Sequence, residues 1–445
     1  MSQKCLIIAD DLTGGADAGA QFAKRGFSTL LISLKDSPSI DFTQYLERDV
    51  LVINTDSRRL SSEKAFRLVS GLLKTYDQRH FPIVYKKIDS TLRGNIGYEI
   101  GAILKETNIP LCFMAPSYPE QKRTLVGGIM MVGKKPIELT EAARDTASPV
   151  QESHVFNLLR NQSSYKIGII DLTYVASNCE RLQKAVEEEQ RKGNRIIVFD
   201  AFSRQHLTNI ADAAFCMDRK PLFVGSAGLA EEVAKKLSPS KARKISQPLQ
   251  KKVKPFKHLF IISGSISGVT HKQLKRVEQD KRIATFQLSK SFMVSENKRA
   301  QAQENNLSSM IGNSLAQGHA ILKTYPKRLS SKDLSGSPIY FGITKTLGQI
   351  ALSALEESKV DVHDLALILT GGDTALSILK SLKAEGVEIE GELLEGIVKG
   401  RLIGGKWQGL KVITKAGAFG KENALVKIIE LLETGSSSSK QEAYF

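Results

Sequence analysis

Short apolar runs that end in polar clusters and lead into helical patterns recur along the chain, about every 30 residues in its first half. This alternation predicts parallel sheets with right-handed crossovers, because neighbouring parallel strands need a connection as long as a helix. We therefore predict an α/β fold of two domains, each a mainly parallel sheet flanked by helices. The predicted strands span residues 4–9, 50–54, 83–88, 110–115, 166–171, 195–200, 221–225, 258–262, 365–369 and 410–414.

The length of 445 residues also indicates two domains, each large enough to bury its own core. The boundary is predicted at 238–257, a run rich in Pro, Ser and Lys, whose part 241–257 holds seven Lys or Arg and no Asp or Glu. The first domain is then 1–237, followed by this basic linker and by a second domain over 258–434. A Ser-rich tail over 435–445 is predicted to be disordered.

The formal net charge of +16 is compatible with nucleic acid, an anionic surface or small anionic substrates as partners. Much of the excess lies in the linker, and aromatic residues are not interleaved with basic ones as in a groove for single-stranded nucleic acid. We expect no nucleic-acid partner, and a basic nucleic-acid-binding protein is the alternative from another class.

The four cysteines, Cys5, Cys112, Cys179 and Cys216, form no Cys-x-x-Cys pair. Their scatter argues against a zinc site and a disulfide framework, and it fits a reducing compartment. The apolar run 5–9 is too short for a signal peptide, and no stretch reaches the length of a membrane span. These features predict a cytoplasmic protein without a membrane partner. A homo-oligomer is compatible with the sequence.

Polar residues that follow one predicted strand are the first candidates for chemistry: Asp89, Ser90 and Arg93, ahead of a helix. Such residues lie at the carboxyl edge of a parallel sheet, where α/β proteins bind ligands. The planar fork of Arg93 matches a carboxylate or phosphate, and Lys86 or Lys87 adds a point charge. Alternatively, Asp89 or Ser90 only caps the helix and Arg93 is a solvated surface residue.

Adjacent carboxylates, Asp10 and Asp11, follow the first strand, and Arg58 follows the second. The two carboxylates suit Mg²⁺ or substrate hydroxyls, and the alternative is that one of them is only a helix N-cap. Because at least four strands end in polar clusters, we expect the clusters to converge on one edge of the sheet. Residues 120–155 interrupt the alternation with glycines and prolines, and we expect a short hairpin that covers this edge. His154 in this stretch is either a site residue or, as lone histidines usually are, structural.

Glycine-bearing turns follow three predicted strands of the second half, each ahead of a helix. Small residues let backbone N–H groups approach an anion, so three such turns suggest a cradle for a polyphosphate. The alternative is that the glycines close tight strand-to-helix turns without a ligand. The turns span residues 263–268, 370–374 and 415–420.

Other motifs are rejected. The run 400–406 nearly spells a Walker A loop, but Trp407 stands where Ser or Thr should be, and the run precedes a strand instead of following one. No Gly-x-Gly-x-x-Gly follows the first strand, which disfavours an NAD-dependent dehydrogenase. The seven histidines show no metal-ligand spacing.

Four strings carry a family resemblance: residues 10–14 (Asp-Asp-Leu-Thr-Gly), 87–94 (Lys-Ile-Asp-Ser-Thr-Leu-Arg-Gly), 149–155 (Pro-Val-Gln-Glu-Ser-His-Val) and 370–375 (Thr-Gly-Gly-Asp-Thr-Ala). Together they make the chain similar to the four-carbon acid sugar kinases. The resemblance implies a first domain that binds a tetronic acid and a second that binds ATP, with the active site in the interdomain cleft. It implies an ATP:four-carbon acid sugar 4-phosphotransferase, which transfers the γ-phosphoryl group to the terminal hydroxyl.

The resemblance and the chemistry of the strand ends together assign roles. D-threonate or D-erythronate is the expected substrate, and 3-oxo-tetronate is the alternative. ATP and Mg²⁺ are the expected cofactors, and the Mg²⁺ ligands remain unassigned. Asp89 or Asp11 is the hypothesis for the group that accepts the hydroxyl proton, with Arg93 as the third catalytic residue. The substrate-binding residues are expected to be Asp10, Asp11, Arg58, Lys87, Asp89, Ser90 and Arg93. The nucleotide-binding residues are expected to be Ser263, Ser265, Gly371, Gly372, Asp373, Thr374 and Gly417.

Overall fold

The computed structural model describes residues 4–34, 40–145, 148–238, 254–265, 267–288, 298–324 and 338–435. The chain divides into two compact units, Met1–Ala242 (unit 1) and Arg243–Phe445 (unit 2). Most of the predicted linker, 239–253, and most of the predicted tail, 436–445, lie outside the described residues. The domain boundaries expected from the sequence therefore stay a prediction.

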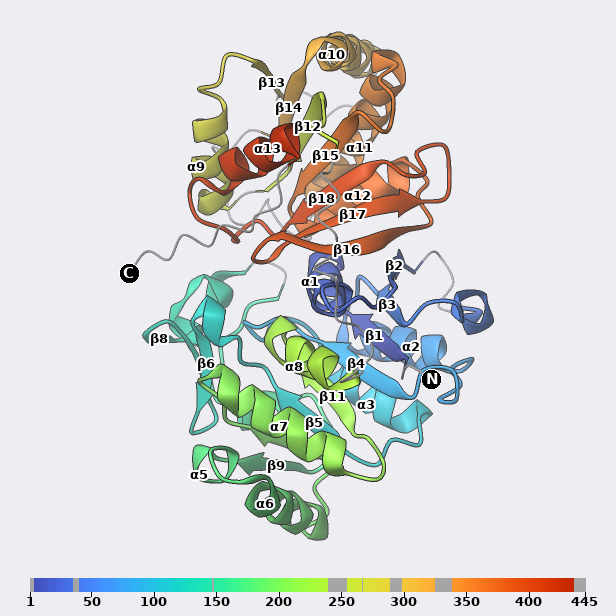
Figure 1. The fold of residues 1–445 in the computed structure, drawn as a ribbon. Coiled ribbons are helices and arrows are strands. Elements are labelled where there is room, and N and C mark those ends of the chain that lie inside the picture. Colours follow the sequence, from blue (N-terminus) through green and yellow to red (C-terminus); the bar gives the residue numbers. More distant parts are fainter. Residues whose placement is uncertain are drawn as a thin grey trace. The chain divides into compact units, whose positions relative to one another are not determined.

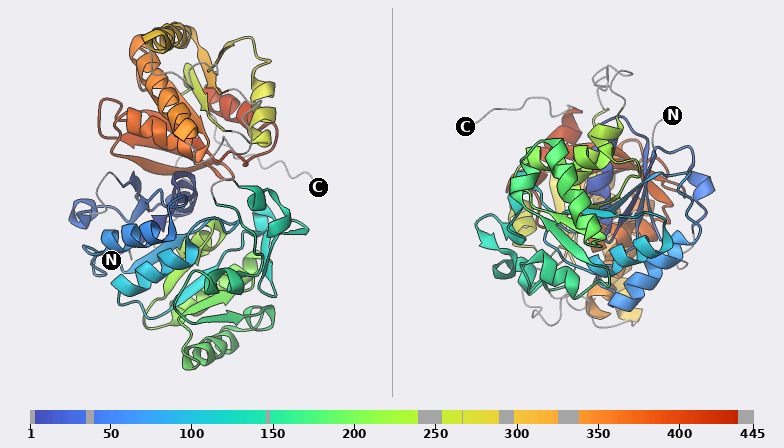
Figure 2. Two further views of the ribbon diagram at one scale, coloured as in Figure 1. Left: turned by 180° about the vertical axis from the view of Figure 1, so that it is seen from behind. Right: turned by 90° about the horizontal axis from the view of Figure 1, so that it is seen from below.

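Unit 1 is built on a parallel sheet with the strand order β2-β3-β1-β4-β11-β5-β10-β9. Helices α1, α8, α7 and α6 cover one face, and α2, α3 and α4 cover the other (Figures 1 and 2). The strands are β1 (Cys5–Ala9), β2 (Thr29–Ser33), β3 (Val50–Asn54), β4 (Ile83–Lys87), β5 (Cys112–Ala115), β9 (Ile167–Ile170), β10 (Ile196–Phe199) and β11 (Leu222–Gly225). The helices are α1 (Leu12–Ala23), α2 (Ser62–Leu73), α3 (Ile96–Glu106), α4 (Val155–Arg160), α5 (Leu172–Val175), α6 (Cys179–Arg191), α7 (Arg204–Cys216) and α8 (Ala227–Leu237).

A small antiparallel sheet, β6-β7-β8, confirms the expected hairpin between residues 120 and 155. Gly127 and Gly128 join β6 to β7 with φ of +59° and +73°, the left-handed backbone that a tight hairpin turn requires. The strands are β6 (Arg123–Val126), β7 (Ile129–Val132) and β8 (Lys135–Pro136). Short 3₁₀ helices of unit 1 are η1 (Phe42–Tyr45), η2 (Pro119–Gln121), η3 (Ile137–Leu139) and η4 (Glu141–Arg144).

Unit 2 is built on a sheet with the order β13-β14-β12-β15-β18-β17-β16, in which β17 runs antiparallel to both of its neighbours. The strands are β12 (His258–Ser263), β13 (Ile283–Gln287), β14 (His319–Lys323), β15 (Leu365–Thr370), β16 (Gly386–Leu394), β17 (Ile397–Ile403) and β18 (Lys411–Lys415). The helices are α9 (Gly268–Val277), α10 (Lys298–Gln317), α11 (Pro338–Ser358), α12 (Gly372–Ser381) and α13 (Ala424–Thr434).

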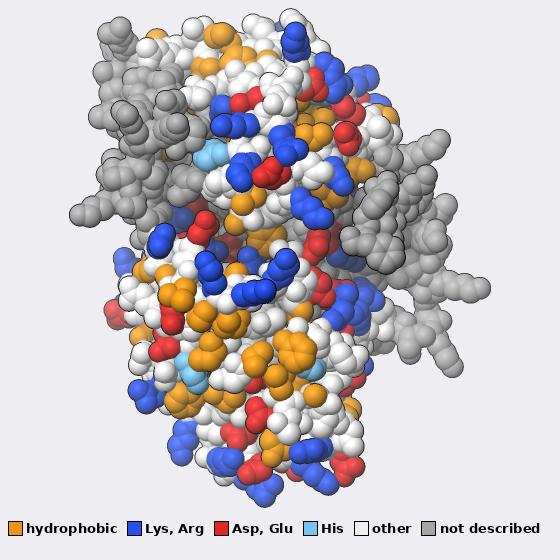
Figure 3. Space-filling model, turned by 90° about the vertical axis from the view of Figure 1, so that its left-hand side faces the viewer, with side chains coloured by type: hydrophobic (Ala, Val, Ile, Leu, Met, Phe, Trp, Pro, Cys, Tyr) orange, Lys and Arg blue, Asp and Glu red, His pale blue; other side chains and the backbone are white. Residues whose placement is uncertain are grey.

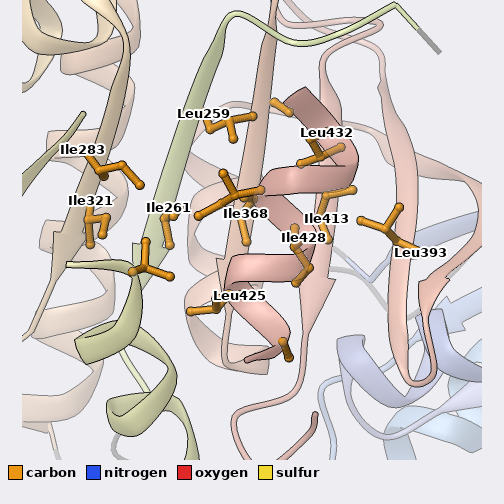
Figure 4. Close-up of a cluster of buried hydrophobic side chains, with 14 of the residues drawn as sticks. Leu259, Ile261, Ile283, Ile321, Ile368, Leu393, Ile413, Leu425, Ile428 and Leu432 are labelled. Atoms are coloured by element: carbon orange, nitrogen blue, oxygen red, sulfur yellow. The ribbon is translucent and has the colours of Figure 1, made fainter. Parts of the chain in front are cut away.

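A continuous apolar cluster joins α13 to the sheet of unit 2 (Figure 4). Leu425, Ile428 and Leu432 follow one another at helical spacing on α13 and pack against Ile368 of β15 and Ile413 of β18. Burying apolar side chains of this size stabilises the fold by about 1.5–3 kcal/mol each. The packing fixes α13, and with it the loop that leads from β18 to this helix, against the sheet.

The structure confirms the mainly parallel α/β class, but it differs from the sequence pattern in detail. The first helix, α1, begins at Leu12, directly after the acidic pair, because the Asp11 side chain accepts the Gly14 N–H and caps the helix there. No strand was expected at β2, β13, β14, β16 or β17. Among the described residues, no helix combines the length and the apolar character that crossing a membrane requires.

Candidate active site

The carboxyl ends of three neighbouring strands of unit 1 meet at one edge of the sheet, as the sequence predicts. Ala9, the last residue of β1, lies beside Asn54 of β3 on one side and beside Lys87 of β4 on the other. The residues that follow these strands are therefore brought together, although they are up to 83 residues apart in the chain, as Asp10 and Arg93 are.

Arg58 is held between the two adjacent carboxylates. Its Nε donates to Asp10 Oδ2 at 2.7 Å and its Nη2 donates to Asp10 Oδ1 at 3.1 Å and to Asp11 Oδ1 at 2.6 Å. The Arg58 side chain is 15% exposed and that of Asp10 is 4% exposed, so the pair is largely withdrawn from water. Asp11 is also the N-cap of α1, so the alternative reading as a cap is correct for Asp11 without excluding its contact with Arg58.

Arg93 forms a second ion-pair cluster. Its Nε and Nη2 donate to the two carboxylate oxygens of Asp89 at 2.6 and 3.1 Å, and its Nη1 donates to Asp145 Oδ2 at 2.9 Å. Ser90 accepts from Nη1 of Arg123, on β6, at 2.6 Å. The reading of Asp89 or Ser90 as the cap of the following helix is wrong, because α3 begins at Ile96.

The surrounding cations keep the buried carboxylate of Asp10 and the partly buried carboxylate of Asp89 ionised. Burial by itself raises the pKa of Asp10, but the charges of Arg58, Lys86 and Lys87 outweigh it and leave the pKa below its ordinary value. Burial likewise opposes ionisation of Asp89, whose pKa is nevertheless held well below its ordinary value by Arg93 and Arg58. At neutral pH the cluster therefore presents carboxylates, not carboxylic acids.

The two lysines at the end of β4 lie on opposite faces of the sheet, since side chains alternate along a strand. Lys86 forms a buried ion pair with Glu99 of α3, with 2.5 Å between Nζ and Oε2. Lys87 Nζ donates to the carbonyl of Ile88 at 2.9 Å, and within the described part of the chain it has no carboxylate at ion-pair distance. Lys87 lies beside Gly14, where a Cβ would be 2.9 Å from its Nζ.

A cavity of about 340 Å³ adjoins the Arg58 cluster. It lies between the loops after β3 and β4, the segment that follows Asp145, and α4 with the residues after it. Of the site residues predicted for unit 1, all of which are described, Arg58 alone lines this cavity. The lining residues are Arg58, Leu60, Leu92, Gly94, Asn95, Ser148, Pro149, Val150, Gln151, Glu152, Leu158, Asn161 and Gln162.

The hairpin is anchored by Asp200, which follows β10. Its carboxylate accepts the N–H groups of Gly127 and Gly128 at 2.7 and 2.9 Å. His154 packs beneath the same turn, where a Cβ on Gly128 would lie 3.0 Å from its Cε1. The hairpin reaches the site through Arg123, which the sequence analysis did not place there.

The three glycine-bearing turns of unit 2 also meet at one sheet edge. Ser263 ends β12 beside Thr370 of β15, which in turn lies beside Lys415 of β18. The Ser263 hydroxyl is buried and accepts the hydroxyl hydrogen of Thr370 at 2.7 Å. Gly371 follows with φ of +97°, a conformation that favours glycine.

The glycines of these turns allow close approach between neighbouring turns. A Cβ on Gly417 would lie 2.5 Å from Ser265 Oγ, and one on Gly264 would lie 2.5 Å from Thr374 Oγ1. Thr374 is only 1% exposed, and within the described residues its hydroxyl has no hydrogen-bond partner. A buried hydroxyl without a partner costs free energy unless a ligand or water satisfies it. Gly372 and Asp373 form the first turn of α12 beside it.

A metal cage of protein ligands does not occur in the described part of the chain, where no three His, Cys, Asp or Glu side chains gather in a way that could hold an ion. Asp10 and Asp11, the pair considered for Mg²⁺, are both bonded to Arg58.

On the face drawn in Figure 3, Lys and Arg side chains are mixed with Asp and Glu, so that face does not favour nucleic-acid binding.

Both units are α/β layers in which charged or small residues follow the strands at one sheet edge, where proteins of this class bind small ligands. The chain matches two family models, a sugar-binding N-terminal domain over residues 5–233 and a nucleotide-binding C-terminal domain over residues 260–425. It belongs to the four-carbon acid sugar kinase family.

Relatives agree with this assignment, and a solved structure shares the fold. The D-threonate kinase of Salmonella typhimurium (strain LT2) is 30% identical over 97% of this chain and 98% of its own. The D-erythronate kinase of Heliobacterium modesticaldum is 29% identical over 98% of this chain and 99% of its own. More distant relatives are named 3-oxo-tetronate kinase. The crystal structure of a Salmonella typhimurium LT2 protein shares the fold, with a TM-score of 0.77 and 19% identity over 96% of this chain and 98% of that one.

Proposed function

We propose that this chain is an ATP-dependent kinase that phosphorylates the 4-hydroxyl of a four-carbon sugar acid, with D-threonate or D-erythronate as its substrate. The observation that carries the proposal is the convergence of Arg58, Lys87, Asp89 and Arg93 at the carboxyl edge of the unit 1 sheet, in a chain of this family. A tetronic acid combines one carboxylate with several hydroxyls, and this edge offers cations for the former and carboxylates for the latter.

Lys87 is the group proposed to bind the substrate carboxylate. Arg58 and Arg93 already have carboxylate partners, whereas Lys87 is bonded to a backbone carbonyl only, as far as the described residues show. The residue is only 5% exposed, and an ion pair with an arriving carboxylate is stronger where water is largely excluded.

Asp89 is proposed to orient the reacting hydroxyl and to accept its hydrogen bond, with Asp11 as the alternative acceptor. The low pKa makes Asp89 a weak base. Phosphoryl transfer depends mainly on positioning and on charge stabilisation, and the nucleophile loses its proton late. Arg93 holds the Asp89 carboxylate through two parallel hydrogen bonds and fixes its direction. Asp10 fixes Arg58 in the same way, and Ser90 adds a hydroxyl to the cluster.

The turns of unit 2 are proposed to bind ATP through Ser263, Ser265, Gly371 to Thr374 and Gly417. The unsatisfied Thr374 hydroxyl and the close approach at Gly264 and Gly417 support a phosphate at this edge. Mg²⁺ would come with the nucleotide, because an ion bound mainly by phosphate oxygens and water needs few protein ligands, and it neutralises phosphate charge during transfer. A cleft that brings the two substrates together stays a prediction.

A substrate panel tests the proposal. The purified chain is given ATP and Mg²⁺ with D-threonate, D-erythronate, L-threonate and buffer alone, and ADP release is recorded with a coupled assay. ADP release with a D-tetronate, together with a 4-phosphate product by NMR, is expected. Absence of ADP release with every four-carbon acid, in a preparation that binds ATP, would refute the assignment.

The runner-up substrate is 3-oxo-tetronate, which is suggested by the names of the more distant relatives. It differs from the tetronates by one carbonyl, and the same cations and carboxylates suit both. Turnover with a 3-oxo-tetronate and none with the D-tetronates would favour this alternative over the first choice.

Two variants test the proposed roles. Asp89→Asn should lower kcat at least 100-fold with unchanged ATP affinity, since one polar contact to the reacting centre supplies about 3 kcal/mol. Asp77→Asn, which changes a half-exposed carboxylate paired with Arg79, is the matched control. Lys87→Met should raise the KM for the sugar acid about tenfold or more, compared with the exposed Lys74→Met. Unchanged kcat in the first variant, or unchanged KM in the second, would remove the role in question.

A further inference from the structure

Backbone carbonyls of the loop after β18 are drawn to one side by three buried side chains. Lys415 Nζ donates to three of them at 3.0–3.4 Å, and Gln273 Nε2 donates to three at 2.9–3.1 Å. Thr270 Oγ1 donates to one at 2.7 Å. We call residues 416–421 the carbonyl-in turn. The accepting oxygens belong to Ala416, Gly417, Phe419, Gly420 and Lys421.

A trans peptide carries its C=O and its N–H on opposite sides. A carbonyl that points toward Lys415 or Gln273 therefore turns the N–H of the next residue the other way. In the described residues the N–H groups of Gly417, Ala418 and Gly420 have no acceptor. Successive N–H groups that point outward in this way form a concave site for an anion.

Lys415 adds a positive charge behind this turn. It is fully buried, and no carboxylate of the described residues lies at ion-pair distance from it. Among those residues its ammonium contacts only Thr270 Oγ1 and backbone carbonyls. Burial lowers its pKa to about 8. A buried cation without a counter-ion is costly, and an anion bound to the turn would offset that cost.

A separate observation places a ligand at the same edge. The Thr374 hydroxyl is buried without a partner and lies against Gly264, while Gly417 of the carbonyl-in turn lies against Ser265. The turn and the unsatisfied hydroxyl therefore belong to adjacent loops after β12, β15 and β18.

We propose that the carbonyl-in turn binds the phosphates of the nucleotide through its outward N–H groups, and that Lys415, Gln273 and Thr270 are the positioning residues that hold it in this orientation. The inference rests on the proposed function and deepens it, since it assigns the phosphate contact to backbone N–H groups and names side chains outside the predicted nucleotide site. Because adenosine has no phosphate, its binding affinity should not depend on these residues.

Calorimetric titration of the full chain with ATP, and separately with adenosine, tests the proposal. Lys415→Met and Gln273→Met should each weaken ATP binding about tenfold or more and leave adenosine binding within about twofold. Thr270→Val, a near-isosteric change, should weaken ATP binding less, and it carries the test if the other variants fail to fold. Lys411→Met removes another buried lysine of β18, paired with Glu390, and serves as the matched control with unchanged ATP affinity.

The pH profile gives a readout that a merely structural role would not move. Bound phosphate favours charged Lys415, so ATP affinity of the wild-type chain should fall as the pH rises through about 8. That step should be absent from Lys415→Met. Wild-type ATP affinity in both methionine variants, or an equal loss of ATP and adenosine binding, overturns this inference alone. A wild-type chain that binds no ATP overturns the proposed function together with it.

Discussion

The buried ion pair between Lys86 of β4 and Glu99 of α3 allows a direct test of the interactions that support the candidate site of unit 1. The Lys86 and Glu99 side chains are 1% and 0% exposed, and Glu99 Oε1 also accepts from Ser57 Oγ at 2.9 Å. Ser57 precedes Arg58, and its hydroxyl lies 2.7 Å from that of Thr55, which donates to the carbonyl of Ala9. The pair thus connects α3 to the ends of two strands.

Removing one partner leaves an uncompensated charge inside the protein. Glu99→Gln and Lys86→Met should each lower the free energy of unfolding by about 3–5 kcal/mol. The double variant should lose much less than the sum, because it buries no charge, and the coupling free energy should exceed about 2 kcal/mol. Urea denaturation followed by far-UV circular dichroism measures all four chains, and the fluorescence of Trp407, the single tryptophan, reports on unit 2 as an internal control.

The pH dependence of Lys86→Met carries a sign that can be checked. Burial raises the pKa of Glu99, and the nearby charge of Asp10 raises it further; without Lys86, only the hydrogen bond from Ser57 still opposes these two effects. An acid whose pKa is raised by folding destabilises the fold as the pH rises from its unfolded pKa to its folded pKa. The variant should therefore be less impaired at pH 5 than at pH 8. Single variants within about 1 kcal/mol of wild type, or additive losses, would refute the reasoning.

Three further predictions concern unit 2 and the cysteines. The Lys415 pKa falls from 10.5 to about 8 on folding. Between pH 8 and pH 10.5 the free energy of unfolding of the wild type should therefore rise by about 3 kcal/mol relative to that of Lys415→Met, as measured by urea denaturation. A difference between the two chains that does not change with pH would argue against the lowered pKa of Lys415. Gly371→Ala should lower stability by about 1–2 kcal/mol and weaken ADP binding, because φ is +97°, and calorimetry of both properties checks it. Cys216 is exposed, whereas Cys5 and Cys112 are fully buried with raised pKa values, so a thiol reagent should label Cys216 quickly and the other two only after unfolding.

Several strands in the middle of the sheets, although not β14 or β17, could be predicted because both of their faces are covered. β1 and β3 are buried at every position and appear as unbroken apolar runs. β16 shows the opposite case, because half-exposed and buried positions alternate along it, and Glu388, Glu390 and Glu392 occupy three of the half-exposed ones. Counting the alternation would have found it, whereas a search for apolar runs does not.

The site could be predicted as a place more readily than as a set of contacts. The rule that parallel strands end together brings Asp10, Arg58 and Asp89 to one edge from the sequence alone. Which cation meets which carboxylate depends on loop paths, such as the left-handed backbone of Leu92 at φ of +57°, and no spacing rule supplies them. The contact of Arg123 with Ser90 was not predicted, because it depends on how the hairpin is held against the sheet. That placement comes from residues distant in sequence, such as Gly127 bonded to Asp200.

The charges around the two proposed sites differ in kind, and the difference fits the two substrates of the proposed kinase. In unit 1, arginine cations are already neutralised by carboxylates, so a monoanionic acid gains mainly from Lys87 and from correctly placed hydrogen bonds. In unit 2, Lys415 faces carbonyls, and the charge that it carries is balanced by no carboxylate in the described residues. A polyphosphate supplies several negative charges and needs many donors, which outward N–H groups provide without adding cations that would hold the product. A singly charged acid bound at such a turn would satisfy few of those donors, so we expect the turn proposed for the nucleotide to favour a polyphosphate over the sugar acid.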